Sequence, residues 1–359
     1  MESMKKFRFA GLSLKSPLGL SSDNVILSES FLEWLRQNNI GIIFTPTLTK
    51  TTIYLKDKRK RYAKINTLEL SESDYIFVTR PLSLTVDELL NNHIGNLKEF
   101  HDANEDIKLV ASIAGKKLND IVNIVEKIEE TKIFSAYEID IVSTQILFNR
   151  RGIYEYAVDL IDEILSIVKK PLLAKIPVSM AINTEIMNDL LKTNINAIVI
   201  SPHPIYSIGS HIFRVHSTAV SHVNINILAK VLTQFEEIDI AYIDDAFTFN
   251  KIQKPFIYKI FNVLLYDVSY LLYFKKGIQF FKKDLREFPV RWQSIRKDFN
   301  LLIDANYLDK CFKVCPFDAI PEKSKDNTIE VSEQCEFCGL CLSLCPKNAV
   351  KKAKIFSPI

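Results

Sequence analysis

The chain is poor in glycine. It has nine glycines among 359 residues, whereas average usage is about 7%. No glycine occurs between Gly209 and Gly277. Turns whose backbone amides cradle a phosphate group usually depend on glycine, so we expect no such turn in that part of the chain.

An excess of charge of one sign is also missing. The chain has 46 basic and 43 acidic residues, a formal net charge of +3, which is too balanced to indicate nucleic-acid binding. One dense basic run, "KDKRKRYAK" from Lys56 to Lys64, stands out. We interpret it as a solvated loop, with docking to an acidic partner as the open alternative.

Long uninterrupted hydrophobic runs are missing too. The most apolar stretch, from Phe256 to Phe281, is broken by Lys259, Asp267 and the Lys275–Lys276 pair, so no membrane span is expected. The opening "MESMKKFRFAGLSLKS" has no long apolar core and does not fit a signal peptide.

Cysteine is absent from the first 310 residues, and all six cysteines lie between Cys311 and Cys345. Clustering of this kind indicates a local metal site rather than a disulfide framework. It also favours a reducing compartment. We therefore expect the protein to be cytoplasmic.

Short apolar runs alternate with helical patterns up to about Phe281. Apolar runs without clean alternation are typical of strands covered on both faces. Eight strands with intervening helices predict an α/β fold, a (β/α)8 TIM barrel, and an open doubly wound sheet remains the alternative. The strand candidates are "SPLGLSS", "GIIFTPTL", "IKLVASIAG", "YEIDIVST", "PLLAKIP", "AIVISPH", "DIAYIDD" and "FIYKIFNV".

Three segments follow from this reading. We predict that residues 1–281 form the barrel, that residues 282–301 form a helical linker, and that residues 302–359 form a small α+β ferredoxin-like iron–sulfur domain. The linker assignment rests on the charged, helix-compatible segment that begins at Gly277.

The segment "CEFCGLCLSLCP" has the spacing C-x2-C-x2-C-x3-C-P. This spacing is typical of bacterial-type ferredoxins, in which the fourth cysteine of each motif ligates the other motif's cluster. A zinc site would instead need paired knuckles well separated in sequence. The motif's cysteines are Cys335, Cys338, Cys341 and Cys345.

An upstream half-motif, "CFKVCP", supplies Cys311 and Cys315, whereas Ala305 and Leu308 stand where two further cysteines would be needed. Crossed ligation gives Cys315 to the complete site. We therefore predict one [4Fe-4S] cluster on Cys315, Cys335, Cys338 and Cys341. Cys311 and Cys345 would be left over and close together, either as free thiols or joined by a short-range disulfide.

Several segments resemble the FMN barrels of dihydroorotate dehydrogenases and dihydropyrimidine dehydrogenases. "FAGLSLKSPLGLSSDN" is similar to the start of those barrels, "YEIDIVSTQ" to their fourth strand and "PLLAKIP" to their fifth. A barrel followed by a ferredoxin module also resembles dihydropyrimidine dehydrogenases. The chain would then be a divergent member of this group.

The resemblance implies roles for several residues. Ser143 falls on the position of the proton-transfer base, and Lys175 on the position of the lysine that faces the flavin. Asp140 and Gln145 fall on ring-binding asparagines. Further implied cofactor contacts are Ser21, Ser22 and Lys50, the last because Pro46 occupies the position of another flavin-contacting lysine.

The phosphate end departs from this family. Its glycine turns after the sixth, seventh and eighth strands fall on "HSTAV" from His216, on Asp244–Asp245, and on Phe261–Asn262. A carboxylate opposes a phosphate charge by roughly 4 kcal/mol at about 4 Å and an effective dielectric of about 20. We expect FMN to be absent or weakly held.

Two functions remain open. The first is an iron–sulfur oxidoreductase that passes electrons between one cluster and a barrel site for a pyrimidine-like small molecule. The second is a non-flavin barrel that serves as scaffold or electron-transfer subunit of a larger complex. Both imply a redox partner protein.

Overall fold

The computed structural model describes most of the barrel and part of the C-terminal segment. Its described residues are 7–23, 28–37, 40–50, 62–65, 76–79, 83–148, 153–203, 205–208, 211–217, 224, 227–228, 231–235, 237–244, 261–266, 299–312, 319–322, 326–332 and 349–354.

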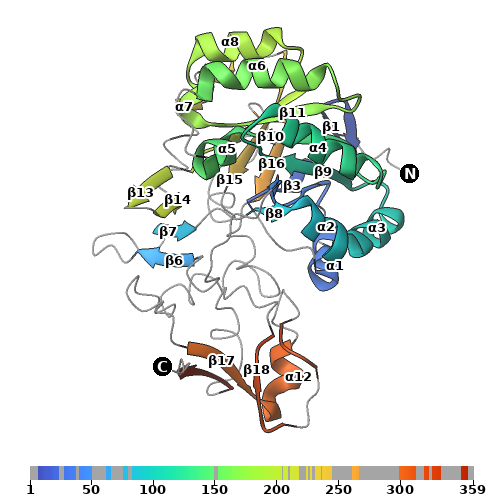
Figure 1. The fold of residues 1–359 in the computed structure, drawn as a ribbon, viewed down its shortest axis with the longest axis vertical. Coiled ribbons are helices and arrows are strands. Elements are labelled where there is room, and N and C mark those ends of the chain that lie inside the picture. Colours follow the sequence, from blue (N-terminus) through green and yellow to red (C-terminus); the bar gives the residue numbers. More distant parts are fainter. Residues whose placement is uncertain are drawn as a thin grey trace.

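Eight parallel strands close into a barrel. Pairing of β9 with β10 and of β16 with β3 completes the ring, so the open-sheet alternative is wrong and the predicted TIM-type barrel is confirmed (Figure 1). The barrel strands are β3 (Leu18–Leu20), β4 (Ile42–Phe44), β9 (Lys108–Ile113), β10 (Ala136–Asp140), β11 (Leu172–Pro177), β12 (Ala197–Ser201), β15 (Asp239–Asp244) and β16 (Val263–Tyr266).

The barrel interior is apolar at the end where the strands begin. Side chains that alternate along the strands, among them Val110, Ala136 and Leu173, form one buried cluster. The hairpin of β1 (Phe7–Phe9) and β2 (Leu12–Leu14) adds Phe9 to that cluster. The Ala10 amide donates to Asp239 Oδ2 at 2.7 Å, so the hairpin covers the end where the strands begin.

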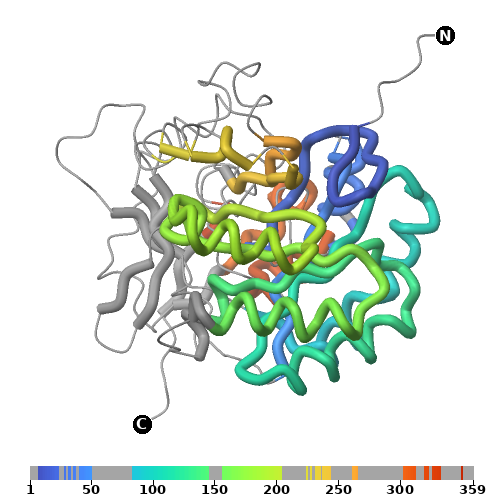
Figure 2. Tube along the Cα trace, turned by 90° about the horizontal axis from the view of Figure 1, so that it is seen from above, coloured from blue at the N-terminus to red at the C-terminus, as the bar shows by residue number. Residues whose placement is uncertain are grey.

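Helices pack around the outside of the barrel. Helix α4 (Leu118–Glu129) buries Ile121, Ile124, Val125 and Ile128, the spacing of an apolar stripe that faces a sheet. Figure 2 shows α4, α6 (Ile153–Leu165) and α8 (Thr184–Lys192) side by side along the barrel wall. Among the described residues, no helix is both long and apolar enough to cross a bilayer.

Two loops at the other end of the barrel join in one sheet. The hairpin β13 (Ile205–Ile208) and β14 (His211–Ser217) follows the sixth barrel strand. Strand β14 pairs with β7 (Ile76–Thr79), which pairs with β6 (Tyr62–Ile65) in the loop after the second barrel strand. His216 therefore lies within a strand, and residues 218–220 of "HSTAV" lie outside the described part. The basic run meets β6 at Tyr62, and its residues 56–61 lie outside the described part.

The eighth strand differs from its prediction. We expected it to start at Phe256, but β16 begins at Val263, and residues 256–260 lie outside the described part. Phe261 and Asn262, onto which the family's eighth-strand turn falls, therefore precede this strand rather than follow it. Asn262 accepts from the Ile240 amide through Oδ1 at 2.8 Å, which ties it to the start of the neighbouring strand.

The C-terminal segment forms a separate three-stranded antiparallel sheet. Its central strand β17 (Phe299–Asp304) pairs with β18 (Thr328–Glu330) and β19 (Val350–Lys354). Residues 299–301, expected at the end of a helical linker, are thus strand, and residues 282–298 lie outside the described part. A short helix, α12 (Leu308–Cys311), follows β17 and the single turn η5 (Ala305–Tyr307).

Candidate functional site

Strand register brings charged residues together at the end where the barrel strands finish. Asp140 on β10 lies beside Lys175 on β11, and Glu138 lies beside Ser112 on β9. Side chains two residues apart on a strand point to the same face, so Glu138 and Asp140 continue the inward row that starts at Ala136. The barrel interior is therefore polar at the end where the strands finish.

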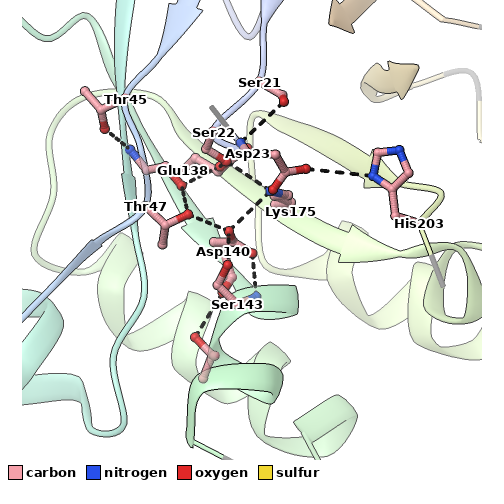
Figure 3. Close-up of polar contacts among 12 residues, drawn as sticks. Ser21, Ser22, Asp23, Thr45, Thr47, Glu138, Asp140, Ser143, Lys175 and His203 are labelled. Carbon is pink, nitrogen blue, oxygen red and sulfur yellow. Dashed lines mark hydrogen bonds and ion pairs between the residues drawn. The ribbon is translucent and has the colours of Figure 1, made fainter. Parts of the chain in front are cut away.

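Lys175 is the centre of this cluster. Its side chain is 0% exposed, and its Nζ lies 2.7 Å from Asp23 Oδ1, 3.0 Å from Ser22 Oγ and 3.3 Å from Asp140 Oδ2. An ammonium group has three donors, and three acceptors surround it here (Figure 3). Lys175 therefore points into the barrel interior and not toward solvent.

Asp140 joins Lys175 to Ser143. Helix α5 (Ile141–Phe148) begins directly after β10, so Ser143 lies on the first turn of a helix rather than on the expected strand. Its amide donates to Asp140 Oδ1 at 2.7 Å and its hydroxyl to Asp140 Oδ2 at 2.5 Å. Thr47 donates to the same Oδ2 at 2.8 Å. Ser143 thus has the carboxylate partner that a serine needs for proton transfer.

Glu138 lies deeper than Asp140 and is 0% exposed. Its Oε1 accepts from Ser22 Oγ at 2.7 Å and from Ser112 Oγ at 2.6 Å. Burial, opposed by the Lys175 charge and assisted by the Asp140 charge, raises the pKa of Glu138 to about 7. This carboxyl group therefore titrates near neutral pH.

Asp23 links the cluster to His203. Its second oxygen, Oδ2, lies 3.9 Å from His203 Nδ1, and both side chains are nearly buried. Figure 3 shows His203 on the far side of Asp23 from Lys175. His203 is therefore part of the site's surroundings rather than a surface histidine.

The remaining residues that the sequence analysis singled out for the barrel site are Ser21, Lys50, Gln145 and Asp244. Ser21 is buried, and its hydroxyl accepts from the Asp23 amide at 3.4 Å. Lys50 is 58% exposed and pairs with Asp120 at 3.0 Å, so the structure does not bring it to the buried cluster. The side chains of Gln145 and Asp244 lie outside the described part.

Sequence reasoning missed Glu138, Asp23, Ser112 and Thr47. The available signal was the alternation in "AYEID", which places Glu138 and Asp140 on the face that also carries Ala136. Two inward carboxyl groups on one strand require a buried cation or protons. That requirement would have predicted that Lys175 lies beside these carboxyl groups.

FMN, which the family resemblance implies, does not fit these residues at its ring end. All three Nζ donors of Lys175 face acceptors of the chain itself. Two of those acceptors are carboxylates, which do not complement the acceptor-rich edge of an isoalloxazine ring. At the phosphate end, Asp245 and residues 218–220 lie outside the described part.

Part of the cysteine module is described. Cys311 is fully buried and disulfide-bonded, while its five fellow cysteines lie outside the described part. Leu308 is also buried, and Ala305 packs against the apolar core. Apolar side chains thus pack at the two positions where a second cluster would need cysteines. Among the described residues, no three His, Cys, Asp or Glu side chains form a group suited to a metal ion.

Comparison with known proteins gives two similarities. Residues 308–356 match the family model described as the LdpA Fe-S cluster-binding domain. A crystal structure of DHODH from Eimeria tenella, in complex with ferulenol, is similar at 13% identity with a TM-score of 0.47, covering 75% of this chain and 81% of that one. No curated protein matches the chain.

The two similarities carry different weight. The DHODH likeness is too remote to support an argument, and the barrel is established by the chain's own strand pairing. The family match includes all six cysteines. The chain therefore combines a closed (β/α)8 barrel with a C-terminal iron–sulfur cluster-binding domain.

Proposed function

We propose that the protein is an electron-transfer protein of the iron–sulfur oxidoreductase class. Its C-terminal domain would hold one [4Fe-4S] cluster on Cys315, Cys335, Cys338 and Cys341. The observation that carries this proposal is the coincidence of all six cysteines with the iron–sulfur family match. Apolar packing of Leu308 supports one cluster rather than two, because a cube needs four ligands.

We infer that the barrel works without FMN. The support is Lys175, whose ammonium is neutralised by Asp23 and Asp140 inside the barrel. The barrel would then serve as the scaffold that brings the cluster to a redox partner protein. A reducing compartment such as the cytoplasm suits this role, since cysteines there stay available as thiolate ligands.

A second candidate is an oxidoreductase that acts on a pyrimidine-like ring. The contact between Ser143 Oγ and Asp140 Oδ2, at 2.5 Å, favours it. Serine alone is a weak base, and an adjacent carboxylate that accepts its proton would activate it. In this case Ser143 would exchange a proton with the ligand, and Lys175 would stabilise the Asp140 charge.

Iron and sulfide analysis of the anaerobically purified full chain tests the first proposal. We expect about four irons and four sulfides per chain, the content of one cube. Cys338→Ala should lose nearly all of both. Twice that content, or zinc without sulfide, would contradict the assignment.

A further inference from the structure

Glu138 has one oxygen that the chain does not satisfy. Oε1 accepts two hydroxyl groups, from Ser22 and Ser112. Oε2 is buried and has no hydrogen-bond partner among the described residues. A buried carboxylate oxygen without a donor is costly, so the ionised form of Glu138 is poorly supported here.

Carboxyl groups are in excess among the described residues around Glu138. Among the described residues, three carboxyl groups (Asp23, Glu138 and Asp140) face one ammonium, Lys175. The only other titratable group that the described contacts place here is the His203 imidazole beside Asp23.

A bound proton resolves this imbalance without needing space. Glu138, Asp140 and Lys175 are all 0% exposed, and an ammonium ion or a metal ion would need room and further ligands. Burial and the Asp140 charge favour the protonated carboxyl group, which is consistent with a pKa of about 7. A proton is thus the cation that this closed cluster can accept.

We propose that Glu138 stores one proton in the folded barrel and exchanges it with the Asp140–Ser143 pair through Ser22 and Lys175. The contacts form an unbroken chain from Glu138 Oε1 to Ser22 Oγ, Lys175 Nζ, Asp140 Oδ2 and Ser143 Oγ. Its donors and acceptors lie 2.5 to 3.3 Å apart. Such a chain can pass a proton in steps.

The transfer balances as follows. Ser143 gives its hydroxyl proton to a ligand and takes one from Lys175 by way of Asp140 Oδ2. The Ser22–Glu138 hydrogen bond reverses in the next step: Ser22 gives its hydroxyl proton to the neutral amine of Lys175 and takes the proton that Glu138 carries on Oε1. Glu138 ends as a carboxylate, the ligand has gained one proton, and the intermediate groups return to their starting state. Neither FMN nor the iron–sulfur cluster takes part.

Infrared difference spectroscopy of the full-length protein tests this proposal. We expect a carbonyl-stretching band of a protonated carboxyl group that disappears as the pH is raised through about 7 and that shifts in D2O. The band should be absent from Glu138→Gln and unchanged in Glu126→Gln, whose glutamate is exposed on α4. No such band in the wild-type protein, or its persistence in Glu138→Gln, would overturn the proposal.

Ser22→Ala tests the path. Without the Ser22 hydroxyl, Glu138 loses its direct link to Lys175 and keeps only the donor from Ser112, whose Oγ lies 3.4 Å from Thr47 Oγ1. We expect the band to remain and its shift after transfer into D2O to become slower than in the wild-type protein. An unchanged rate would exclude Ser22 as the route. Because iron and sulfide content is measured separately, failure of the cluster assignment and failure of this proposal are distinguishable.

Discussion

Lys175 Nζ and Asp23 Oδ1 lie 2.7 Å apart, although 152 residues separate them in the chain. The Lys175 side chain is 0% exposed and that of Asp23 is 3% exposed. The pair joins the end of the first barrel strand to the fifth. Lys175 thus serves as the internal counterion of carboxylates inside the barrel.

Replacing Lys175 by methionine, which has a similar volume, should strongly destabilise the barrel. Removing one partner of a buried ion pair typically costs about 3–5 kcal/mol, because the other charge stays buried and uncompensated. Urea unfolding measures this loss.

Lys192→Met is the matched control for this substitution. Lys192 pairs with Asp189 on the exposed face of α8, and an exposed pair contributes about 0–1 kcal/mol. If Lys175→Met were no more destabilising than Lys192→Met, Lys175 would not be the internal counterion.

Stability should depend on pH through Glu138. The pKa of Glu138 is raised from 4.5 to about 7 in the folded protein, so the folded state holds more protons than the unfolded state between these values. The free energy of unfolding contributed by Glu138 is fully present below about pH 4.5 and is lost as the pH rises through about 7. The loss is on the order of 3 kcal/mol.

Glu138→Gln should flatten this part of the stability curve. Glutamine keeps the size of the side chain but cannot titrate, and denaturant titrations across the pH range compare the two proteins. An equal slope in Glu138→Gln and wild-type protein would assign the pH dependence to other groups.

Ser143→Ala should have a modest effect on stability. The substitution removes one donor to Asp140 Oδ2, which still accepts from Thr47 and lies near Lys175. A loss of about 1–2 kcal/mol is expected. Ser166→Ala, which removes an exposed hydroxyl bond to the Glu163 carbonyl, should change stability less. A larger loss than for Lys175→Met would show that Ser143 rather than Lys175 holds the cluster together.

The leftover cysteines should be dispensable for the cluster. Cys311→Ser and Cys345→Ser should each retain the visible absorption of the cluster, whereas Cys315→Ser should lose it, because only Cys315 is predicted to be a ligand. Loss of the cluster in Cys311→Ser would mean that the crossed-ligand assignment is wrong.

Apolar runs predicted most of the barrel, because buried parallel strands carry little else. The first seven barrel strands lie where "SPLGLSS" through "DIAYIDD" place them. The eighth was misplaced because "FIYKIFNVLLY" is apolar except at Lys259 and Asn262. No turn signal in the sequence marks where this strand begins. A tertiary hydrogen bond from the Ile240 amide to Asn262 instead holds the residue before the strand in place.

The site could be predicted only in part. Lys175, Asp140, Ser143 and Ser22 were identified through family resemblance, but the resemblance did not indicate that they bond to one another. Asp23 and Glu138 were missed because their partners are 152 and 116 residues away. Pairings at such distances depend on strand register, which local sequence patterns do not specify.

Cofactor analysis of the anaerobically purified protein tests the central claim most directly. The visible spectrum is recorded first, and the cofactors released by acid are then identified and counted. We predict iron and sulfide for one cluster and no stoichiometric FMN, because the donors of Lys175 already face Ser22, Asp23 and Asp140. One FMN per chain, or apoprotein that binds FMN clearly more tightly than riboflavin, would contradict the account.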